Sequence, residues 1–180
     1  GGMMAAGIPP YRLPREIIAR GYDRIRSLGV DIRLNTAVGP DGDYTLADLF
    51  ESGYEAVCLA IGAHKGRMLP IPGKELPGVV DGIELLKAIN LTERCDQTDY
   101  EDKLEELLPQ GGRTRAVVLG GGNTAMDASR SLKRLGLEDV RVLYRRSREE
   151  MPALPEEVNE AGEEGVVFDL LVSPVRVLGD

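Results

Sequence analysis

Apolar residues recur along this chain with two different periods, and these periods predict helices and strands in turn. Helical spacing predicts helices over residues 15–28, 45–50, 83–90, 100–108, 125–135 and 155–161. Short apolar or alternating runs predict strands over residues 30–34, 56–61, 115–119, 139–144, 166–171 and 175–178. This order of elements is typical of an α/β protein.

Several predicted helices carry recognisable ends. Thr45, with Asp48 three residues later, is expected to cap the helix that follows it. Asp81 is placed to cap the helix over residues 83–90, and Gly136 stands where a left-handed residue would end the helix over 125–135.

The run from Ala56 to Ile61 is apolar throughout, which predicts a central parallel strand covered on both faces. Cys58, inside this run, is therefore expected in the core. The segment after it, residues 62–67, would form a turn at the carboxyl end of the strand, where ligands of open α/β sheets bind. His64, the only histidine in the sequence, is expected on the surface of that turn.

A strand, a glycine turn and a helix follow one another between residues 115 and 135. Gly120 would allow a tight turn, and Gly122 has no Cβ to obstruct a pyrophosphate. Ala125 would keep the helix close to the sheet. The first helical turn offers free N–H groups, and Asn123 and Thr124 add side-chain donors. The pattern indicates one half of a dinucleotide-binding βαβ unit.

The second strand of this unit ends at Tyr144 and is followed by Arg145 and Arg146, without a carboxylate before Glu149. A site for NAD favours an acid at this point, whereas two guanidinium groups can bind a 2′-phosphate. The sequence therefore predicts NADP rather than NAD. Glycine turns also occur without ligands, and an arginine pair can be simple solvated surface, so these alternatives stay open.

Composition and net charge argue against some classes of binding partner. The chain has 180 residues and a formal net charge of −8, which argues against nucleic acid or an anionic membrane as a partner. No apolar run approaches the roughly 20 residues that a membrane helix needs. The two cysteines, Cys58 and Cys95, form no C-x-x-C motif, and a cytoplasmic location is expected.

Four stretches resemble the two-dinucleotide flavoproteins typified by the small (beta) subunit of NADPH-dependent glutamate synthase. They are Gly1–Arg15, Ala60–Arg67, Leu119–Asp127 and Tyr144–Ala153. The resemblance implies a Rossmann-like FAD/NAD(P)-binding three-layer fold with a parallel sheet, helices and a β-meander. It also implies a fragment of a longer chain, comprising a partial FAD-binding segment and linker (residues 1–72) and an NADPH-binding domain (residues 73–180).

The same resemblance implies an enzyme that passes hydride from NADPH to FAD and electrons on to iron–sulfur clusters. The NADPH contacts that it implies are Gly120, Gly122, Asn123, Thr124, Ala125, Arg145 and Arg146. Gly1, Gly2, Ile61 and Gly62 would lie on the FAD side. The FAD site would be incomplete here, and the clusters would lie in missing regions or in a partner. No catalytic acid, base, nucleophile or metal ligand is predicted, and the isolated fragment is expected to be inactive.

The implied partners are the remainder of the FAD domain and an iron–sulfur domain or the large glutamate synthase subunit. A related electron-transfer subunit is the first alternative. A simple NADP-dependent dehydrogenase or a non-catalytic NADP-binding module remains possible as well. Thioredoxin reductases share a similar turn and arginine pair, but the stretch Gly82–Leu91 has no cysteine for dithiol exchange.

Overall fold

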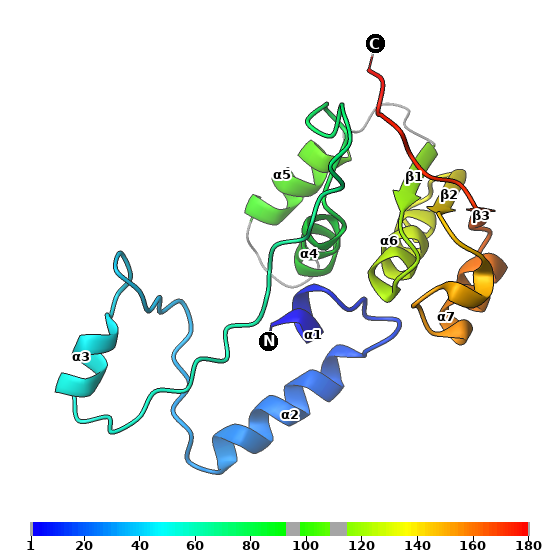
Figure 1. The fold of residues 1–180 in the computed structure, drawn as a ribbon. Coiled ribbons are helices and arrows are strands. Elements are labelled where there is room, and N and C mark those ends of the chain that lie inside the picture. The colour runs from blue at the N-terminus through cyan, green and yellow to red at the C-terminus, as the bar shows by residue number, and fades with distance from the viewer. Residues whose placement is uncertain (1, 93–97, 109–114, 180) are drawn as a thin grey trace. The chain divides into compact units, whose positions relative to one another are not determined.

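The computed structural model describes residues 2–92, 98–108 and 115–179 (Figure 1). The chain divides into two compact units. Unit 1 contains Gly1–Arg15 and His64–Asp180, and unit 2 contains Glu16–Ala63. The predicted division into domains at residues 72 and 73 stays a prediction.

Unit 1 is built around a parallel sheet of three strands in the order β1-β2-β3, with bounds Arg115–Leu119, Asp139–Tyr144 and Val167–Leu170. In the register, Val118 lies opposite Val142, and Val142 lies opposite Phe168. The helix α6 (Asn123–Arg134) joins β1 to β2, and α7 (Pro155–Glu163) precedes β3. The strand–helix–strand unit predicted from the glycine turn is thus present.

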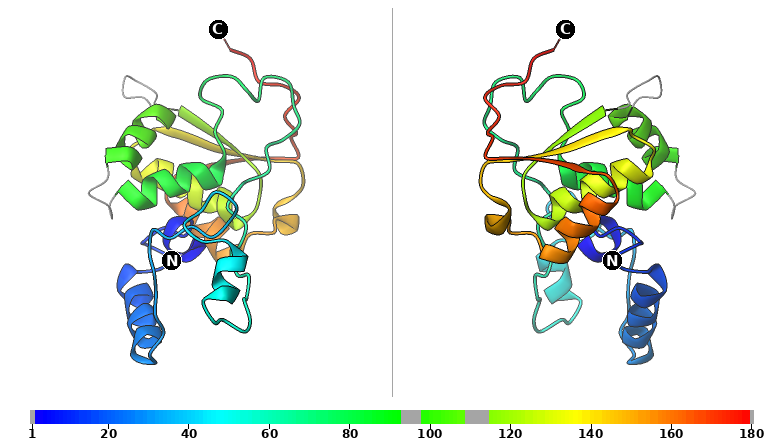
Figure 2. Two further views of the ribbon diagram at one scale, coloured as in Figure 1. Left: turned by 90° about the vertical axis from the view of Figure 1, so that its left-hand side faces the viewer. Right: turned by 90° about the vertical axis from the view of Figure 1, so that its right-hand side faces the viewer.

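Both α6 and α7 pack on the same side of the sheet, as the two views in Figure 2 show. One core cluster joins Met126 of α6, Val142 of β2 and Ala161 of α7. A second cluster joins α6 to α4 (Gly82–Thr92) through Leu85, Ala128 and Leu132. The next helix, α5 (Thr98–Leu107), packs against α4.

The remaining elements are short helices and one longer helix. They are α1 (Met3–Ala6), α2 (Arg15–Ser27), α3 (Leu46–Glu51) and the 3₁₀ turn η1 (Arg148–Glu150). The predicted helix ends are confirmed. Thr45 forms a capping box with Asp48, Asp81 Oδ1 accepts from the N–H groups of the residues two and three positions later, and Gly136 has φ +95°.

Three predicted strands are wrong. Residues 30–34, 56–61 and 175–178 have no regular structure. A strand requires a hydrogen-bonded neighbour, and β1, β2 and β3 pair only with one another among the residues described. Cys58 is accordingly exposed rather than part of the core, and Cys95 lies outside the described residues.

Burial of Met126 is expected to stabilise unit 1. The side chain is fully buried between the sheet and α7, so Met126→Ala should lower the free energy of unfolding by about 2–5 kcal/mol. Urea unfolding of the intact protein measures the change. Met4→Ala, at a position that is 54% exposed, is the matched control and should have little effect. Equal losses for the two variants would contradict this description of the core.

Candidate dinucleotide site

Gly120 turns the chain at the end of β1. Its φ of +137° lies in the region that only glycine adopts readily, and its N–H still donates to the carbonyl oxygen of Leu143 at 3.1 Å. A Cβ at this position would lie 3.8 Å from the Cβ of Ala125, which is 8% exposed. The turn and the start of α6 are therefore packed closely together, as the sequence pattern predicts.

Gly122, the N-cap of α6, has a different reason to be glycine. Its φ of −94° and ψ of 173° suit any residue. A Cβ at this position would meet no atom nearer than Cγ of Pro152 at 4.0 Å. Neither backbone conformation nor packing against the described residues requires glycine here, so the missing side chain leaves open space over the start of the helix. A bound anion could use that space.

The start of α6 offers donors to such an anion. The N–H groups of Ala125 and Met126 donate to the carbonyl oxygen of Gly122, and the N–H groups before them are those that a helix start leaves open. Thr124 is exposed at this point. The positive end of the helix dipole favours negative charge at the same place.

The amide of Asn123 is oriented by the chain itself. Its Oδ1 accepts from the backbone N–H of Leu154 at 3.0 Å. Because a backbone N–H can only donate, the side-chain atom that it meets must be the oxygen. The NH₂ group of Asn123 is therefore left to donate elsewhere, at an exposed position beside Gly122.

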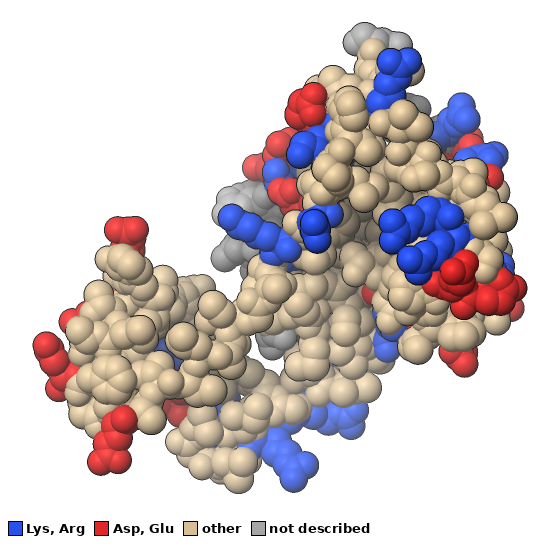
Figure 3. Space-filling view, in the orientation of Figure 1, with Lys and Arg blue, Asp and Glu red and all other residues tan. Residues whose placement is uncertain are grey.

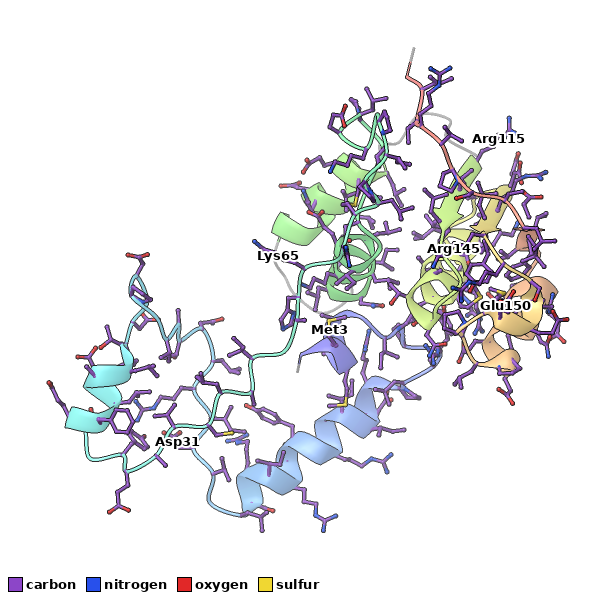
Figure 4. All side chains as sticks on the ribbon, viewed as in Figure 1. Met3, Asp31, Lys65, Arg115, Arg145 and Glu150 are labelled. Atoms are coloured by element: carbon purple, nitrogen blue, oxygen red, sulfur yellow. The ribbon has the colours of Figure 1, made fainter. Side chains whose placement is uncertain are left out.

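Arg145 and Arg146 follow β2 directly, and both are exposed. Among the residues that the structure describes, no acidic side chain pairs with either guanidinium group. Figure 3 shows a group of basic atoms on this face next to a group of acidic ones, where Figure 4 labels Arg145 and Glu150. The pair is thus available to an external anion.

Arg148, only two residues further on, is held by the protein. Its guanidinium lies 5.5 Å from the centre of the Phe168 ring, and its Nη2 donates to Oδ1 of Asn159 at 3.0 Å. Three neighbouring arginines therefore divide into one structural residue and two unpaired ones.

A cavity of about 1220 Å³ opens beside the glycine turn. Its lining is largely apolar and includes Val117 of β1, Leu85 of α4 and Val177, together with Gly122 and Thr124. Arg145 and Arg146 do not belong to the described residues that line it. The start of α6 therefore lies between an apolar cavity and a basic surface.

The sequence pattern did not predict two positions at which packing requires glycine. A Cβ on Gly121 would lie 2.7 Å from two carbon atoms of the Tyr144 ring, so this central glycine is required for packing. A Cβ on Gly66 would overlap the carboxylate of Asp81, which caps α4. Neither requirement can be read from sequence because each depends on a residue from another element.

The sequence also did not predict a buried ionic network on α6. Asp127 and Arg130 are each 4% exposed, although both are charged. Arg12 Nη1 donates to the two carboxylate oxygens of Asp127 at 2.9 and 2.7 Å, and its Nε lies 2.6 Å from Oε1 of Glu157. Burial raises the pKa of the Asp127 carboxyl, and the hydrogen bond from Arg12 opposes that rise.

Arg130 completes the network with three carboxylates of α7 and the residue after it: Glu157 at 2.9 Å, Glu160 at 2.7 Å and Glu164 at 2.8 Å. It also stands 4.5 Å from the centre of the Tyr11 ring. Burial raises the pKa of Tyr11 to about 12. The N-terminal segment is thus fastened to the helix that begins at the glycine turn.

The residues predicted on the FAD side fall in different units. Gly1 lies outside the described residues, and Gly2, with φ +60°, caps α1 in unit 1. Ile61 is 78% exposed and Gly62 has φ +66°, and both belong to unit 2. Their part in a flavin site stays a prediction. His64 is exposed, as expected, and its carbonyl oxygen accepts from Lys87 Nζ at 3.1 Å.

Within residues 2–92, 98–108 and 115–179, no three His, Cys, Asp or Glu side chains are arranged to hold a metal ion. Over the same described residues, every helix is too short or too polar to span a bilayer.

Across residues 29–179 the sequence matches the family described as pyridine nucleotide-disulphide oxidoreductase. The chain belongs to this family. FprA from Mycobacterium tuberculosis, solved in complex with NADPH, has a similar fold with a TM-score of 0.75 at 21% identity. That likeness covers 99% of this chain and 52% of FprA, and it confirms the predicted α/β fold class with a parallel sheet and helices.

Several relatives are oxidoreductase subunits. The chain is 41% identical to the beta subunit of NADP(+)-dependent formate dehydrogenase of Moorella thermoacetica and 42% identical to that of NADPH-Fe(3+) oxidoreductase of Geobacter sulfurreducens. It is 36% identical to the glutamate synthase (NADPH) small chain of Escherichia coli. These alignments cover 98–100% of this chain but only 23%, 25% and 36% of the three relatives. The resemblance to the glutamate synthase small-subunit family is thereby confirmed.

Loss of the Asp127 carboxylate is expected to destabilise unit 1. Asp127→Ala removes the carboxylate that accepts from Arg12 Nη1 and leaves Arg12 paired with Glu157 alone. The change should cost about 2–4 kcal/mol, less than for a fully buried pair because Arg12 keeps 19% of its side chain exposed. Asp31→Ala, which breaks the exposed pair with Arg33, is the control and should change nothing measurable. Thermal unfolding of the intact protein tests both, and an unchanged midpoint for Asp127→Ala would refute the role of the network.

Proposed function

We propose that this chain is the NADPH-binding part of a flavin-dependent oxidoreductase that passes hydride from NADPH to FAD and electrons on to iron–sulfur clusters. The type that we favour is the small subunit of NADPH-dependent glutamate synthase. Family membership and the name of the Escherichia coli relative support this assignment.

One observation carries the proposal: an open, donor-rich helix start lies beside two unpaired arginines. The space over Gly122 fits a pyrophosphate, which the free N–H groups of α6 and the NH₂ group of Asn123 would bind. Arg145 and Arg146, exposed at the end of β2, would bind the 2′-phosphate of the adenosine ribose. The two anionic groups of NADPH thus meet two different sets of donors.

When bound, NADPH supplies the hydride, and the chain's own residues serve to bind and orient it. Gly120 and Ala125 keep the turn close to the sheet, so the N–H groups of α6 point at one fixed place. The apolar cavity on the other side of the turn would exclude water from the reacting end of the coenzyme. No acid or base is required for this step, which agrees with the absence of a predicted catalytic residue.

The flavin site is a further part of the proposal. Gly1, Gly2, Ile61 and Gly62 would contribute to it, together with the remainder of the FAD domain. The iron–sulfur clusters would belong to other regions of the protein or to a partner, such as the large glutamate synthase subunit. The relatives are subunits several times longer than this chain, which supports partners of this kind. A cytoplasmic location is proposed with them.

A second candidate is a related electron-transfer subunit with another acceptor. The identities of 41% and 42% to the formate dehydrogenase and Fe(3+) oxidoreductase beta subunits favour it, because they exceed the 36% to the glutamate synthase small chain. All three relatives are named for NADP or NADPH, so the candidates differ in acceptor and not in coenzyme.

The absorbance spectrum of the purified intact protein tests both candidates. We expect a flavin spectrum that NADPH bleaches under anaerobic conditions, because hydride reduces the flavin. Reoxidation by the large glutamate synthase subunit with glutamine and 2-oxoglutarate would support the first candidate, and reoxidation by Fe(3+) or through a formate dehydrogenase subunit would support the second. A colourless protein would refute both.

Removal of the arginine pair tests the coenzyme site. In the intact protein, the double variant Arg145→Ala/Arg146→Ala should lose about thirty- to a thousandfold of its preference for NADPH over NADH, because bidentate contacts to the 2′-phosphate are lost. The ratio of the two Kd values, measured by titration, gives the preference. An unchanged ratio would contradict the assignment of these arginines.

Two variants serve as controls for this experiment. Arg148→Ala removes a neighbouring positive charge that is already engaged with Phe168 and Asn159, so the preference should stay nearly constant. Asn123→Asp keeps an oxygen for the N–H of Leu154 but replaces the free donor with negative charge. It should weaken NADPH and NADH alike, because both coenzymes contain the pyrophosphate.

A further inference from the structure

Tyr144 joins the glycine turn to the loop that follows the arginine pair. It is the last residue of β2 and is 9% exposed. Its ring lies directly against Gly121, where a Cβ would come within 2.7 Å of the ring carbons. Its hydroxyl donates to the carbonyl oxygen of Glu150 at 2.8 Å. One side chain therefore contacts both the glycine turn and the loop that follows the arginine pair.

The loop after the arginine pair returns to the same turn. Ser147 and Glu150 form a capping box, in which the N–H of Ser147 donates to Oε2 of Glu150 at 3.1 Å. Met151 and Ala153 are buried in the core, and the N–H of Ala153 donates to the carbonyl oxygen of Gly121 at 3.0 Å. Residues 147–154, which we call the return loop, are thus fixed to the glycine turn.

The backbone of the arginine pair is also held from the other side. The carbonyl oxygen of Tyr144 accepts from the N–H of Val172 at 3.2 Å, and that of Arg146 accepts from the N–H of Leu171 at 3.3 Å. The backbone around Arg145 and Arg146 is therefore constrained by its neighbours, although both side chains are exposed. Contacts within the chain thus fix the points on the backbone from which the two side chains extend.

We propose that Tyr144 is a positioning residue that sets the preference for the phosphorylated coenzyme. This inference rests on the proposed function. Bidentate recognition of a phosphate depends on geometry as well as charge. The hydroxyl of Tyr144 holds the return loop at Glu150, and through it the distance between the arginine pair and the helix start that would bind the pyrophosphate. Without this bond the two anion-binding groups would match the spacing of NADPH less well.

Tyr144→Phe in the intact protein is the test, because it keeps the ring against Gly121 and removes only the hydroxyl. The expected result is a loss of about two- to tenfold in the preference for NADPH over NADH, as for one ordinary hydrogen bond. The affinity for NADH and the flavin spectrum should stay unchanged. Tyr54→Phe, at a position in unit 2 that is 54% exposed, is the matched control.

A second arm repeats Tyr144→Phe in the Arg145→Ala/Arg146→Ala background. There the substitution should have no further effect on the ratio, because the groups that it positions are gone. Equal weakening of NADPH and NADH, or the same loss of preference without the arginines, would overturn the inference and leave a purely structural role. An unchanged preference for NADPH in Tyr144→Phe would overturn the role of Tyr144 but not the proposed coenzyme. A wild-type protein without preference for NADPH would overturn the proposed coenzyme as well.

Discussion

The burial of two opposite charges on one helix is the constraint that organises unit 1. Asp127 and Arg130 are almost fully buried in α6, and a charge in that position is tolerated only when it is paired and hydrogen-bonded. Arg12 of the N-terminal segment neutralises the first, and carboxylates on and after α7 neutralise the second. The helix that begins at the glycine turn is therefore fixed along its length by segments far apart in sequence.

This arrangement explains how a short turn can present donors at a defined place. The glycines allow the approach of an anion, but glycine alone gives a flexible backbone. The network around Arg130 holds the body of α6, whereas Tyr144 and the return loop hold its beginning. Contacts from residues outside the turn make it rigid, so the turn itself can be short.

Local signals in the sequence predicted the strand–helix–strand unit, three helix ends and the place of the arginine pair directly after the second strand. Thr45, Asp81 and Gly136 act through residues within three or four positions, and such effects are visible in the sequence. The strand at residues 56–61 was mispredicted because apolar content does not supply a neighbouring strand. The chain contact between Arg12 and Asp127 spans 115 positions, and no local pattern encodes it.

The candidate site shows the same limit. Gly120 and Gly122 stand at recognisable positions of a known pattern, but the need for Gly121 depends on a ring from the end of β2. Likewise, the orientation of Asn123 depends on the N–H of Leu154, which lies 31 positions away. The pattern locates the site, and contacts between elements decide how each residue works in it.

The difference among the three neighbouring arginines bears on how such proteins diverge. Arg148 is tied to Phe168 and Asn159, so its replacement disturbs packing. Arg145 and Arg146 have no described partner, so their replacement leaves no buried group unsatisfied. If these two residues bind the 2′-phosphate as proposed, natural selection could alter coenzyme choice at two positions while the scaffold keeps its stability. Descendants of one ancestor could then exchange electron donors without refolding the domain that receives them.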